Sequence, residues 1–384
     1  MSTPTLLSPQ AAAQLFDPDR LRQARLAGEW TQKGLAASVG LTPAAISQFE
    51  HGHTRPSPET LAALAAHTGY ALTYFTAGRP TTPNSTDGWH FRSLSSTSKR
   101  QRDRAAILAT HVWELAIALT RNVRFPTVTI PALPTSESSA KARIAAAAAE
   151  ARRCLNLGPG PVADVVRSVE AGGVVTARLA TDLPAVDGFS RVLPEFPVMV
   201  LGTEKNDAAR SRFDAAHELG HLVMHRQFKG SHRTKEQQAN AFAAEFLAPA
   251  EEIGASLPAD ADFAALAKLK RIWGMSMASL LYRSRELGVM SDAKYRRAVT
   301  RMQQLGWRQS EPVDLGPPEE PQLLATALQL VADRGITIHQ IAAQTALPLD
   351  LVQRIAGEPP TEVFPKSATT GASGGGQVFH GRFA

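Results

Sequence analysis

Two histidines separated by one helical turn, with a glutamate between them, constrain this chain more than any other feature. They stand in His217-Glu218-Leu219-Gly220-His221. Residues i and i+4 of an α-helix lie on one face, so His217 and His221 can bind one tetrahedral Zn²⁺ while Glu218 lies beside it. Apolar residues at helical spacing on both sides predict a helix here. The pattern therefore predicts a zinc-hydrolase site.

The third ligand is expected from a second predicted helix, which opens with Glu236, fifteen residues after His221. Asn240 follows one turn later and can accept the outer N–H of a ligating histidine, which fixes the tautomer of that ligand. A solvated carboxylate at a helix N-terminus is the other interpretation of Glu236. Glu245 is the alternative ligand.

Several motifs occur in the order of a known family. These are His-Glu-Leu-Gly-His-Leu-Val-Met-His, the Glu236–Leu247 segment, Pro159-Gly160-Pro161, Gly172-Gly173 and Val186-Asp187-Gly188-Phe189-Ser190. From about residue 151 to 287 the chain resembles the ImmA/IrrE family of bacterial metallopeptidases, although Ala248 stands where that family usually has Met. The resemblance implies a zinc peptidase that makes limited cuts in a transcriptional repressor during stress, DNA damage or mobile-element induction.

The residues also indicate a mechanism for a gluzincin-like metalloendopeptidase. Zinc held by His217, His221 and Glu236 would lower the pKa of a water molecule and polarise the scissile carbonyl. Glu218 would act as general base and return the proton to the leaving amine. Zinc is preferred from the ligand types, but such a site can accept other divalent ions.

Two further elements are expected near the site. His225 is a candidate oxyanion donor, although a packed or surface histidine fits the sequence equally well. The apolar run Val198–Leu201 predicts a short strand that can pair with an extended substrate backbone.

The N-terminal region predicts a second functional unit, made of short helices between about Leu21 and Gly78. Thr31 and Thr42 are expected to cap two of these helices, with a turn at Gly40 between them. This arrangement is typical of a helix-turn-helix. The segments Ile46-Ser47-Gln48-Phe49-Glu50-His51-Gly52 and Arg55-Pro56-Ser57-Pro58-Glu59-Thr60-Leu61 resemble the XRE (Cro-repressor-type) family.

In that fold the helix from Pro43 to Phe49 would enter the major groove, and Gln48 is the candidate for a bidentate contact to adenine. A solvated polar position is the other interpretation of Gln48. Gln32 and Arg55 suit phosphate contacts, which position the protein without reading sequence. The full set of expected DNA-contacting residues is Gln32, Thr42, Ala44, Ala45, Ser47, Gln48 and Arg55.

The expected fold class is mainly α with a small β-sheet (α+β), in keeping with two or three domains for 384 residues. The predicted segments are a helix-turn-helix domain at 1–79, a linker and connecting helix at 80–135, a zincin-like peptidase domain at 136–292, a C-terminal helical region at 293–357 and a disordered tail at 358–384. The connecting helix is expected to start after Ser98 and to run to about Arg121. Residues 309–321 are expected to form a Pro- and Glu-containing linker.

Composition favours a cytoplasmic protein. The chain has a single cysteine, Cys154, and lacks both a signal-peptide core and an apolar run of the roughly 20 residues that a membrane span needs. Its formal net charge of +6 is compatible with nucleic acid. The expected partners are a double-stranded DNA operator, a repressor as substrate, a second copy of the chain in a homodimer and, from the family resemblance, single-stranded DNA as activator.

Two functions from different classes follow. The first is a DNA-tethered zinc peptidase that cleaves a repressor. The second is a sequence-specific transcription factor whose metal site is structural or sensory. Glu218 favours the enzyme, because a structural site needs no general base.

Overall fold

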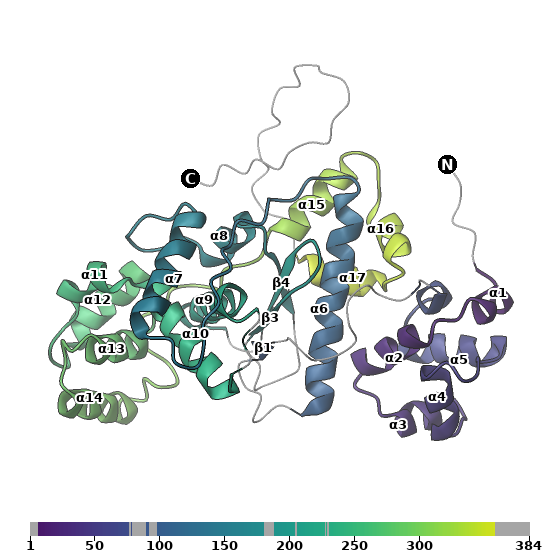
Figure 1. The fold of residues 1–384 in the computed structure, drawn as a ribbon, viewed down its shortest axis with the longest axis horizontal. Helices are drawn as coiled ribbons and strands as arrows, with labels where there is room; N and C mark the ends of the chain where they lie inside the picture. The colour runs from purple at the N-terminus through teal and green to yellow at the C-terminus, as the bar shows by residue number, and fades with distance from the viewer. Residues whose placement is uncertain are drawn as a thin grey trace, which may run out of the picture. The chain divides into compact units, whose positions relative to one another are not determined.

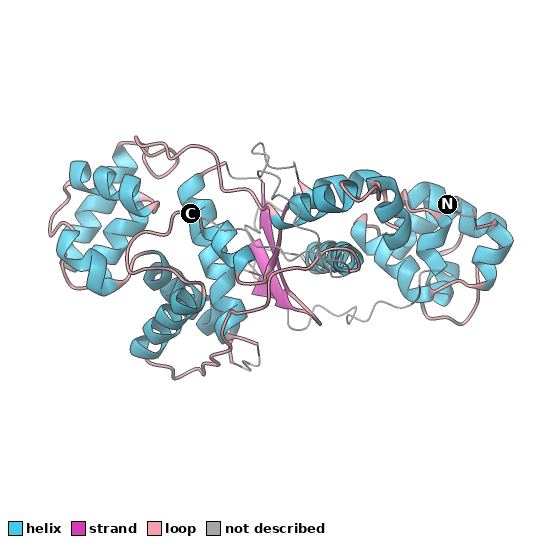
Figure 2. Cartoon of the chain, turned by 90° about the horizontal axis from the view of Figure 1, so that it is seen from above, coloured by secondary structure: helices cyan, strands magenta, loops and turns pink. Residues whose placement is uncertain are grey.

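The computed structural model describes residues 7–76, 78, 90–91, 98–179, 188–203, 206–226, 228 and 230–357. The predicted tail at 358–384, residues 80–89 and 92–97 of the predicted linker, and residues 186–187 lie outside this part of the chain. Helices dominate the described residues, and the strands are confined to one small sheet (Figures 1 and 2). The prediction of a mainly α fold with a small β-sheet is confirmed. None of these helices combines the length and apolar character that a membrane crossing needs.

The chain divides into two compact units, each described here by itself. One comprises Met1–Phe125, Leu193–Val198 and Gln322–Ala384, and the other comprises Pro126–Val192 and Met199–Pro321. The boundaries of the five predicted segments stay predictions.

The first unit contains the predicted helix-turn-helix. Its elements are α1 (Pro9–Gln14), α2 (Pro18–Ala27), α3 (Gln32–Ser38), α4 (Pro43–Glu50), α5 (Pro58–Thr68), η1 (Leu72–Thr76), β1 (His90–Phe91), α6 (Lys99–Thr120), α15 (Leu323–Ala332), α16 (Ile338–Thr345) and α17 (Leu349–Ala356). Thr31 and Thr42 cap α3 and α4, as predicted, by accepting hydrogen bonds from backbone N–H groups. Gly40 makes the turn between them with a φ of +69°, a conformation that glycine adopts without strain.

Helix α6 contacts helices from both ends of the chain within this unit. Ser98 and Gln101 form a capping box at its start, so the predicted cap is confirmed. α6 packs against α2, α15 and α16. The helix therefore joins the helix-turn-helix to the C-terminal helices.

A buried polar network fixes α6 to the helix-turn-helix. Arg20 of α2 forms an ion pair with Glu114 of α6 at 2.8 Å. The phenol of Tyr74 donates to Oε1 of Gln23 at 3.0 Å and lies 3.1 Å from Nε2 of His111. Because the phenol proton is used for Gln23, the phenol oxygen accepts from His111, whose proton is therefore on Nε2. Burial, and then the nearby Arg20 charge, lower the pKa of His111 to about 3.

The second unit combines helices with strands of the small sheet. Its elements are α7 (Lys141–Cys154), α8 (Val165–Ala171), β2 (Val175–Leu179), β3 (Gly188–Val192), β4 (Pro197–Gly202), α9 (Ala208–Met224), α10 (His232–Leu247), α11 (Ala250–Ile253), η2 (Gly254–Ser256), α12 (Phe263–Trp273), α13 (Met277–Glu286) and α14 (Asp292–Gln304). Helix α9 packs on β3 and on α10. A Cβ at Gly220 would lie 2.9 Å from the ring of Phe242, so this glycine allows α9 and α10 their close approach.

One expectation for this region needs correction. The predicted strand at Val198–Leu201 exists as β4, but β4 lies between β3 and β2. Both of its edges are paired within the sheet, so it cannot add a substrate strand. Gly274 ends α12 with a φ of +65° and separates it from α13.

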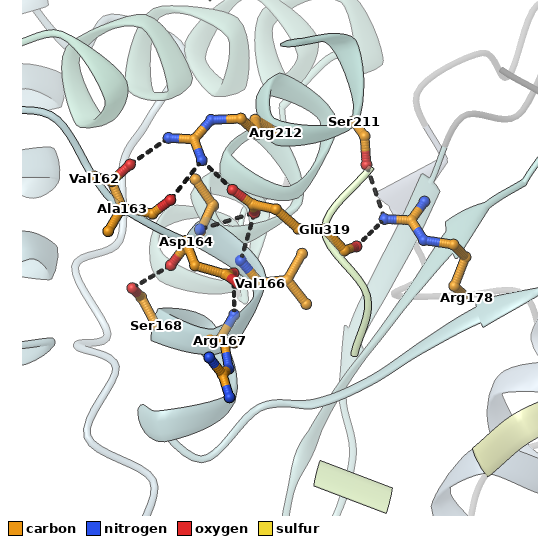
Figure 3. A network of polar contacts seen from close by, with 11 residues as sticks. Val162, Ala163, Asp164, Val166, Arg167, Ser168, Arg178, Ser211, Arg212 and Glu319 are labelled. Atoms are coloured by element: carbon orange, nitrogen blue, oxygen red, sulfur yellow. Dashed lines mark hydrogen bonds and ion pairs between the residues drawn. The ribbon is translucent and has the colours of Figure 1, made fainter. Parts of the chain in front are cut away.

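The segment after α14 is not a free linker. Glu319 accepts a hydrogen bond from the backbone N–H of Val166 at 3.0 Å and forms an ion pair with Arg212 of α9 (Figure 3). Arg178 of β2 donates to the carbonyl oxygen of Glu319 at 2.6 Å and to Oγ of Ser211 at 2.9 Å. These contacts hold the segment against α8 and the start of the histidine-bearing helix.

Candidate metal centre and nucleic-acid face

Helix α9 presents the two histidines together. Asp207 caps the helix by accepting from the N–H of Arg210 at 2.7 Å, and the helix continues unbroken to Met224. His217 is 0% exposed and His221 is 1% exposed. Their Nε2 atoms lie 3.1 Å apart, so both rings present the same nitrogen to one point.

Glu236 joins them from α10. This helix begins at His232 after the cap Ser231, four residues earlier than predicted, so Glu236 lies in its second turn and not at its N-terminus. Its Oε2 is 3.4 Å from Nε2 of His217, and its Oε1 is 3.2 Å from Nε2 of His221. Ligand atoms of all three residues lie within 4.8 Å of one another.

The alternative ligand lies elsewhere. Glu245 forms an ion pair with Arg283 and accepts from the N–H of Ala250 at 2.9 Å. Among the residues described, it does not belong to the group that includes Glu236.

The three groups fit a tetrahedral cation. Three ligands at about 2.0 Å from a zinc ion stand roughly 3.3 Å from one another at the corners of a tetrahedron. The separation of 3.1 Å between the two Nε2 atoms is close to this value, and each oxygen of Glu236 lies near a different histidine, Oε2 at 3.4 Å from His217 and Oε1 at 3.2 Å from His221. The outer nitrogen of His217 lies 3.0 Å from Oδ1 of Asn240, the contact expected from the sequence. If the outer nitrogen of His217 carries the proton, its Nε2 has a lone pair that faces the Glu236 carboxylate. Two such electron-rich groups repel each other unless a cation lies between them.

His225 has a different place from the one considered in the sequence. It is 2% exposed, and its Nδ1 lies 2.8 Å from Nδ1 of His221, the ring nitrogen turned away from Glu236. Its interpretation as an oxyanion donor is therefore wrong. Burial lowers the pKa of His225 to about 4, so the ring is neutral at pH 7.

Glu218 points toward β3. The carboxylate accepts a hydrogen bond from Oγ of Ser190 at 2.7 Å, and both residues are fully buried. Gly188, on the same face of the strand, would bring a Cβ within 3.3 Å of the Glu218 side chain. The sequence reasoning missed Ser190, although its alternation with buried Phe189 could have placed it on the face toward α9.

His232 also lies near the centre. Its Nε2 is 3.6 Å from Oε1 of Glu236, and its side chain is 37% exposed. The sequence reasoning missed it, although the i, i+4 spacing from Glu236 was a usable signal.

The expected DNA face lies on α3, α4 and the following turn. Thr42, Ala44 and Gln48 are exposed, whereas Ala45 and Ser47 are half-buried. These five residues belong to α4 or its cap. Ile46 and Phe49 of the same helix are buried in the core, whereas Gln48 is exposed.

The two expected phosphate contacts also have partners within the fold. Nε2 of Gln32 donates to Oε2 of Glu50 at 2.9 Å, and Glu50 is also bound by Arg25. The guanidinium of Arg55 donates to the carbonyl of Gln14 at 2.8 Å while the residue stays exposed. Each of these side chains is therefore held by a partner within the first unit.

Comparison with protein families agrees with both halves of this description. Residues 169–285 match the family model of the IrrE N-terminal-like domain, a peptidase family, and residues 21–75 match a helix-turn-helix model. The chain joins an IrrE-like peptidase domain to an XRE-type helix-turn-helix domain. A search of curated proteins found no match to the chain.

The matched ranges contain the features described above. The IrrE-like range includes α9, α10 and the sheet strands β3 and β4, and the helix-turn-helix range includes α3 and α4. The chain thus has a metallopeptidase-like domain and a DNA-binding domain. Glu319, which holds α9 from outside, lies beyond the matched range.

Proposed function

We propose that this protein is a DNA-binding zinc metalloendopeptidase that regulates transcription by cleaving a repressor, in a stress or mobile-element response. The observation that carries the proposal is the convergence of His217, His221 and Glu236 on one point, on the helix that also holds Glu218. A chain that reads DNA and cuts protein would act where repressors are bound. A protein substrate in the cytoplasm fits both domains.

His217, His221 and Glu236 would hold the zinc ion. Zinc bound there supplies a Lewis acid that polarises the scissile carbonyl and makes water a better nucleophile. One carboxylate and two neutral imidazoles leave the bound dication with a net positive charge, which favours this role. Asn240 would hold the ring of His217 through its outer nitrogen.

Glu218 would move the proton. It would take a proton from the attacking water and return it to the leaving amine. Ser190 donates a hydrogen bond to Oε2 of Glu218, so this carboxylate oxygen acts as an acceptor. The same bond holds the carboxylate in a fixed direction.

The helix-turn-helix would bind an operator through α4. Gln48 is exposed and can make a bidentate contact with adenine in the major groove. Thr42, Ala44, Ala45 and Ser47 would line the same surface, and Gln32 and Arg55 would contact phosphates at its edge. A homodimer on paired half-sites and activation by single-stranded DNA remain predictions that accompany this proposal.

The test compares the wild-type protein with Glu218→Gln in cells that contain neighbouring repressors, by mass spectrometry of all proteins. Glu218→Gln should bind zinc as the wild type does, because Glu218 is not among the three ligands. A cut that appears only with the wild type would establish the peptidase and identify its substrate. If the wild type binds zinc but cuts nothing under stress or with single-stranded DNA, a transcription factor with a structural or sensory metal site is the better description.

A further inference from the structure

A chain of hydrogen bonds leads outward from His221. Nδ1 of His221 lies 2.8 Å from Nδ1 of His225, and Nε2 of His225 lies 3.0 Å from Oε1 of Gln238 on α10. Gln238 Oε1 also accepts from Oγ1 of Thr135 at 2.7 Å, and Gln238 Nε2 donates to the carbonyl of Ser136 at 2.7 Å. His225 and Gln238 are both buried.

The far end of this chain fixes its direction. A backbone carbonyl only accepts, so the group of Gln238 that faces Ser136 must be its NH₂ group. The carbonyl of Gln238 then faces Thr135 and His225, and both must donate to it. His225 therefore carries its proton on Nε2. The remaining nitrogen, Nδ1, faces Nδ1 of His221 at 2.8 Å, and such a contact needs one donor and one acceptor.

The near end requires the same direction. His221 turns Nε2 toward His217 and Glu236, so the lone pair of that nitrogen is the one available to a metal. The proton of His221 is then on Nδ1, where it meets the lone pair of His225. One arrangement of protons therefore satisfies every hydrogen bond in this chain, from His221 through His225 and Gln238 to Thr135 and Ser136.

We infer that His225 is a positioning residue that holds the metal-ligating tautomer and ring plane of His221. The inference rests on the proposed metal site, of which His221 is a ligand. Asn240 serves His217 directly, whereas His221 is held through an interposed imidazole that is anchored by Gln238. Outer partners of this kind typically change metal affinity by 10- to 100-fold when they are removed.

The geometry also distinguishes His225 from ordinary core packing. Its ring lies edge-on to Phe228, with ring centroids 5.3 Å apart, so it has an apolar contact that is separate from its hydrogen bonds. A substitution that keeps an aromatic ring preserves much of this packing and removes both the acceptor that faces His221 and the donor that faces Gln238. His225→Phe is therefore the informative change, and Phe228→Leu is its matched control.

The test measures the zinc dissociation constant of the full chain by competition with a chromogenic chelator, together with the visible spectrum of the Co²⁺-substituted protein. We expect His225→Phe to weaken zinc binding by roughly 10- to 100-fold and to alter the Co²⁺ spectrum, because the His221 ring is no longer held. Asn240→Leu should weaken binding to a similar extent. Phe228→Leu should keep wild-type affinity and spectrum, since it changes packing alone.

A second variant covers the case in which His225→Phe does not fold. Gln238→Met removes the acceptor behind His225 and releases its tautomer, so a smaller loss of zinc affinity and a changed Co²⁺ spectrum are expected. Wild-type zinc affinity and spectrum in a folded His225→Phe, or in Gln238→Met when the first variant is unfolded, would overturn the inference. That result would leave the proposed peptidase intact. A wild-type chain that binds neither ion would overturn both.

Discussion

Oγ of Ser190 lies 2.7 Å from Oε2 of Glu218, and the contact joins β3 to the middle of α9. Ser190 is 0% exposed and Glu218 is 1% exposed, so the bond is not shared freely with bulk water. A hydrogen bond to a charged group contributes about 1.5–3 kcal/mol, more than a bond between neutral groups. The strand therefore controls the direction in which the proposed general base points.

Ser190→Ala should slow peptide cleavage without removing the metal. The turnover number is expected to fall roughly tenfold, the change that corresponds to about 1.4 kcal/mol, whereas zinc content stays at the wild-type value. Single-turnover cleavage of the substrate identified with Glu218→Gln would measure the effect. Ser211→Ala is the matched control, because Ser211 is also buried on α9 but accepts from Arg178. Equal rates for Ser190→Ala and the wild type would contradict the positioning role of Ser190.

The sequence predicted those parts of the site that depend on spacing within one helix. His217 and His221 follow from i, i+4 geometry, and the Asn240 contact followed from the same rule applied to α10. Helix caps were equally local, and Thr31 and Thr42 are where the pattern placed them. In each case the signal lies within one turn of chain.

The parts that were missed depend on contacts between distant segments. Gln238 reaches His225 on another helix and Ser136 on a preceding loop, and no periodicity links these positions. Residues 309–321 were interpreted as a linker because Pro and Glu are typical of linkers. In the folded chain, however, Glu319 of this segment accepts a hydrogen bond from the first turn of α8 and forms an ion pair with Arg212. Composition cannot distinguish a solvated carboxylate from one that meets a buried guanidinium.

Glu319→Ala should destabilise the peptidase unit. It leaves Arg212, which is 7% exposed, without its carboxylate partner, and breaking a buried ion pair from one side costs of the order of 3 kcal/mol or more. Urea unfolding followed by tryptophan fluorescence, to which Trp273 and Trp307 of this unit contribute, would show a lower midpoint. Glu320→Ala is the matched control, since Glu320 is 57% exposed and its pair with Arg178 should contribute less than about 1 kcal/mol. Equal losses for the two variants would contradict the role assigned to Glu319.

His111 should make the first unit sensitive to acid. The ordinary pKa of histidine is about 6.5, and burial lowers the pKa of His111 to about 3 in the folded protein. Between these values the unfolded chain binds a proton that the folded chain does not, so stability falls as the pH drops below about 6.5. Hydrogen exchange of peptides from α2 and α6, at pH 7 and pH 4, would measure this loss once corrected for intrinsic exchange rates.

His111→Phe should reduce the acid sensitivity of those peptides. Tyr74 keeps its donor bond to Gln23 in this variant, so the network loses only the bond to the imidazole. His339→Phe, a substitution at an exposed position of α16, should keep the wild-type response to pH. An unchanged acid response in His111→Phe would show that another titratable group determines the acid sensitivity of α2 and α6.

Gln48→Ala and Arg55→Ala should weaken DNA binding in different ways. Operators would first be selected with the wild-type protein from a random duplex library. Gln48→Ala should then lose about 1–3 kcal/mol on selected sites and little on unrelated DNA, because a bidentate adenine contact reads sequence. Arg55→Ala should weaken both classes of DNA alike and reduce the dependence of log Kd on log salt concentration, because a phosphate contact releases counterions without reading sequence. A thermal melt of Arg55→Ala is needed as a control, since Arg55 also binds the Gln14 carbonyl. If Gln48→Ala weakened all DNA equally, Gln48 would be a phosphate contact or a solvated position, and sequence reading would have to come from another part of α4.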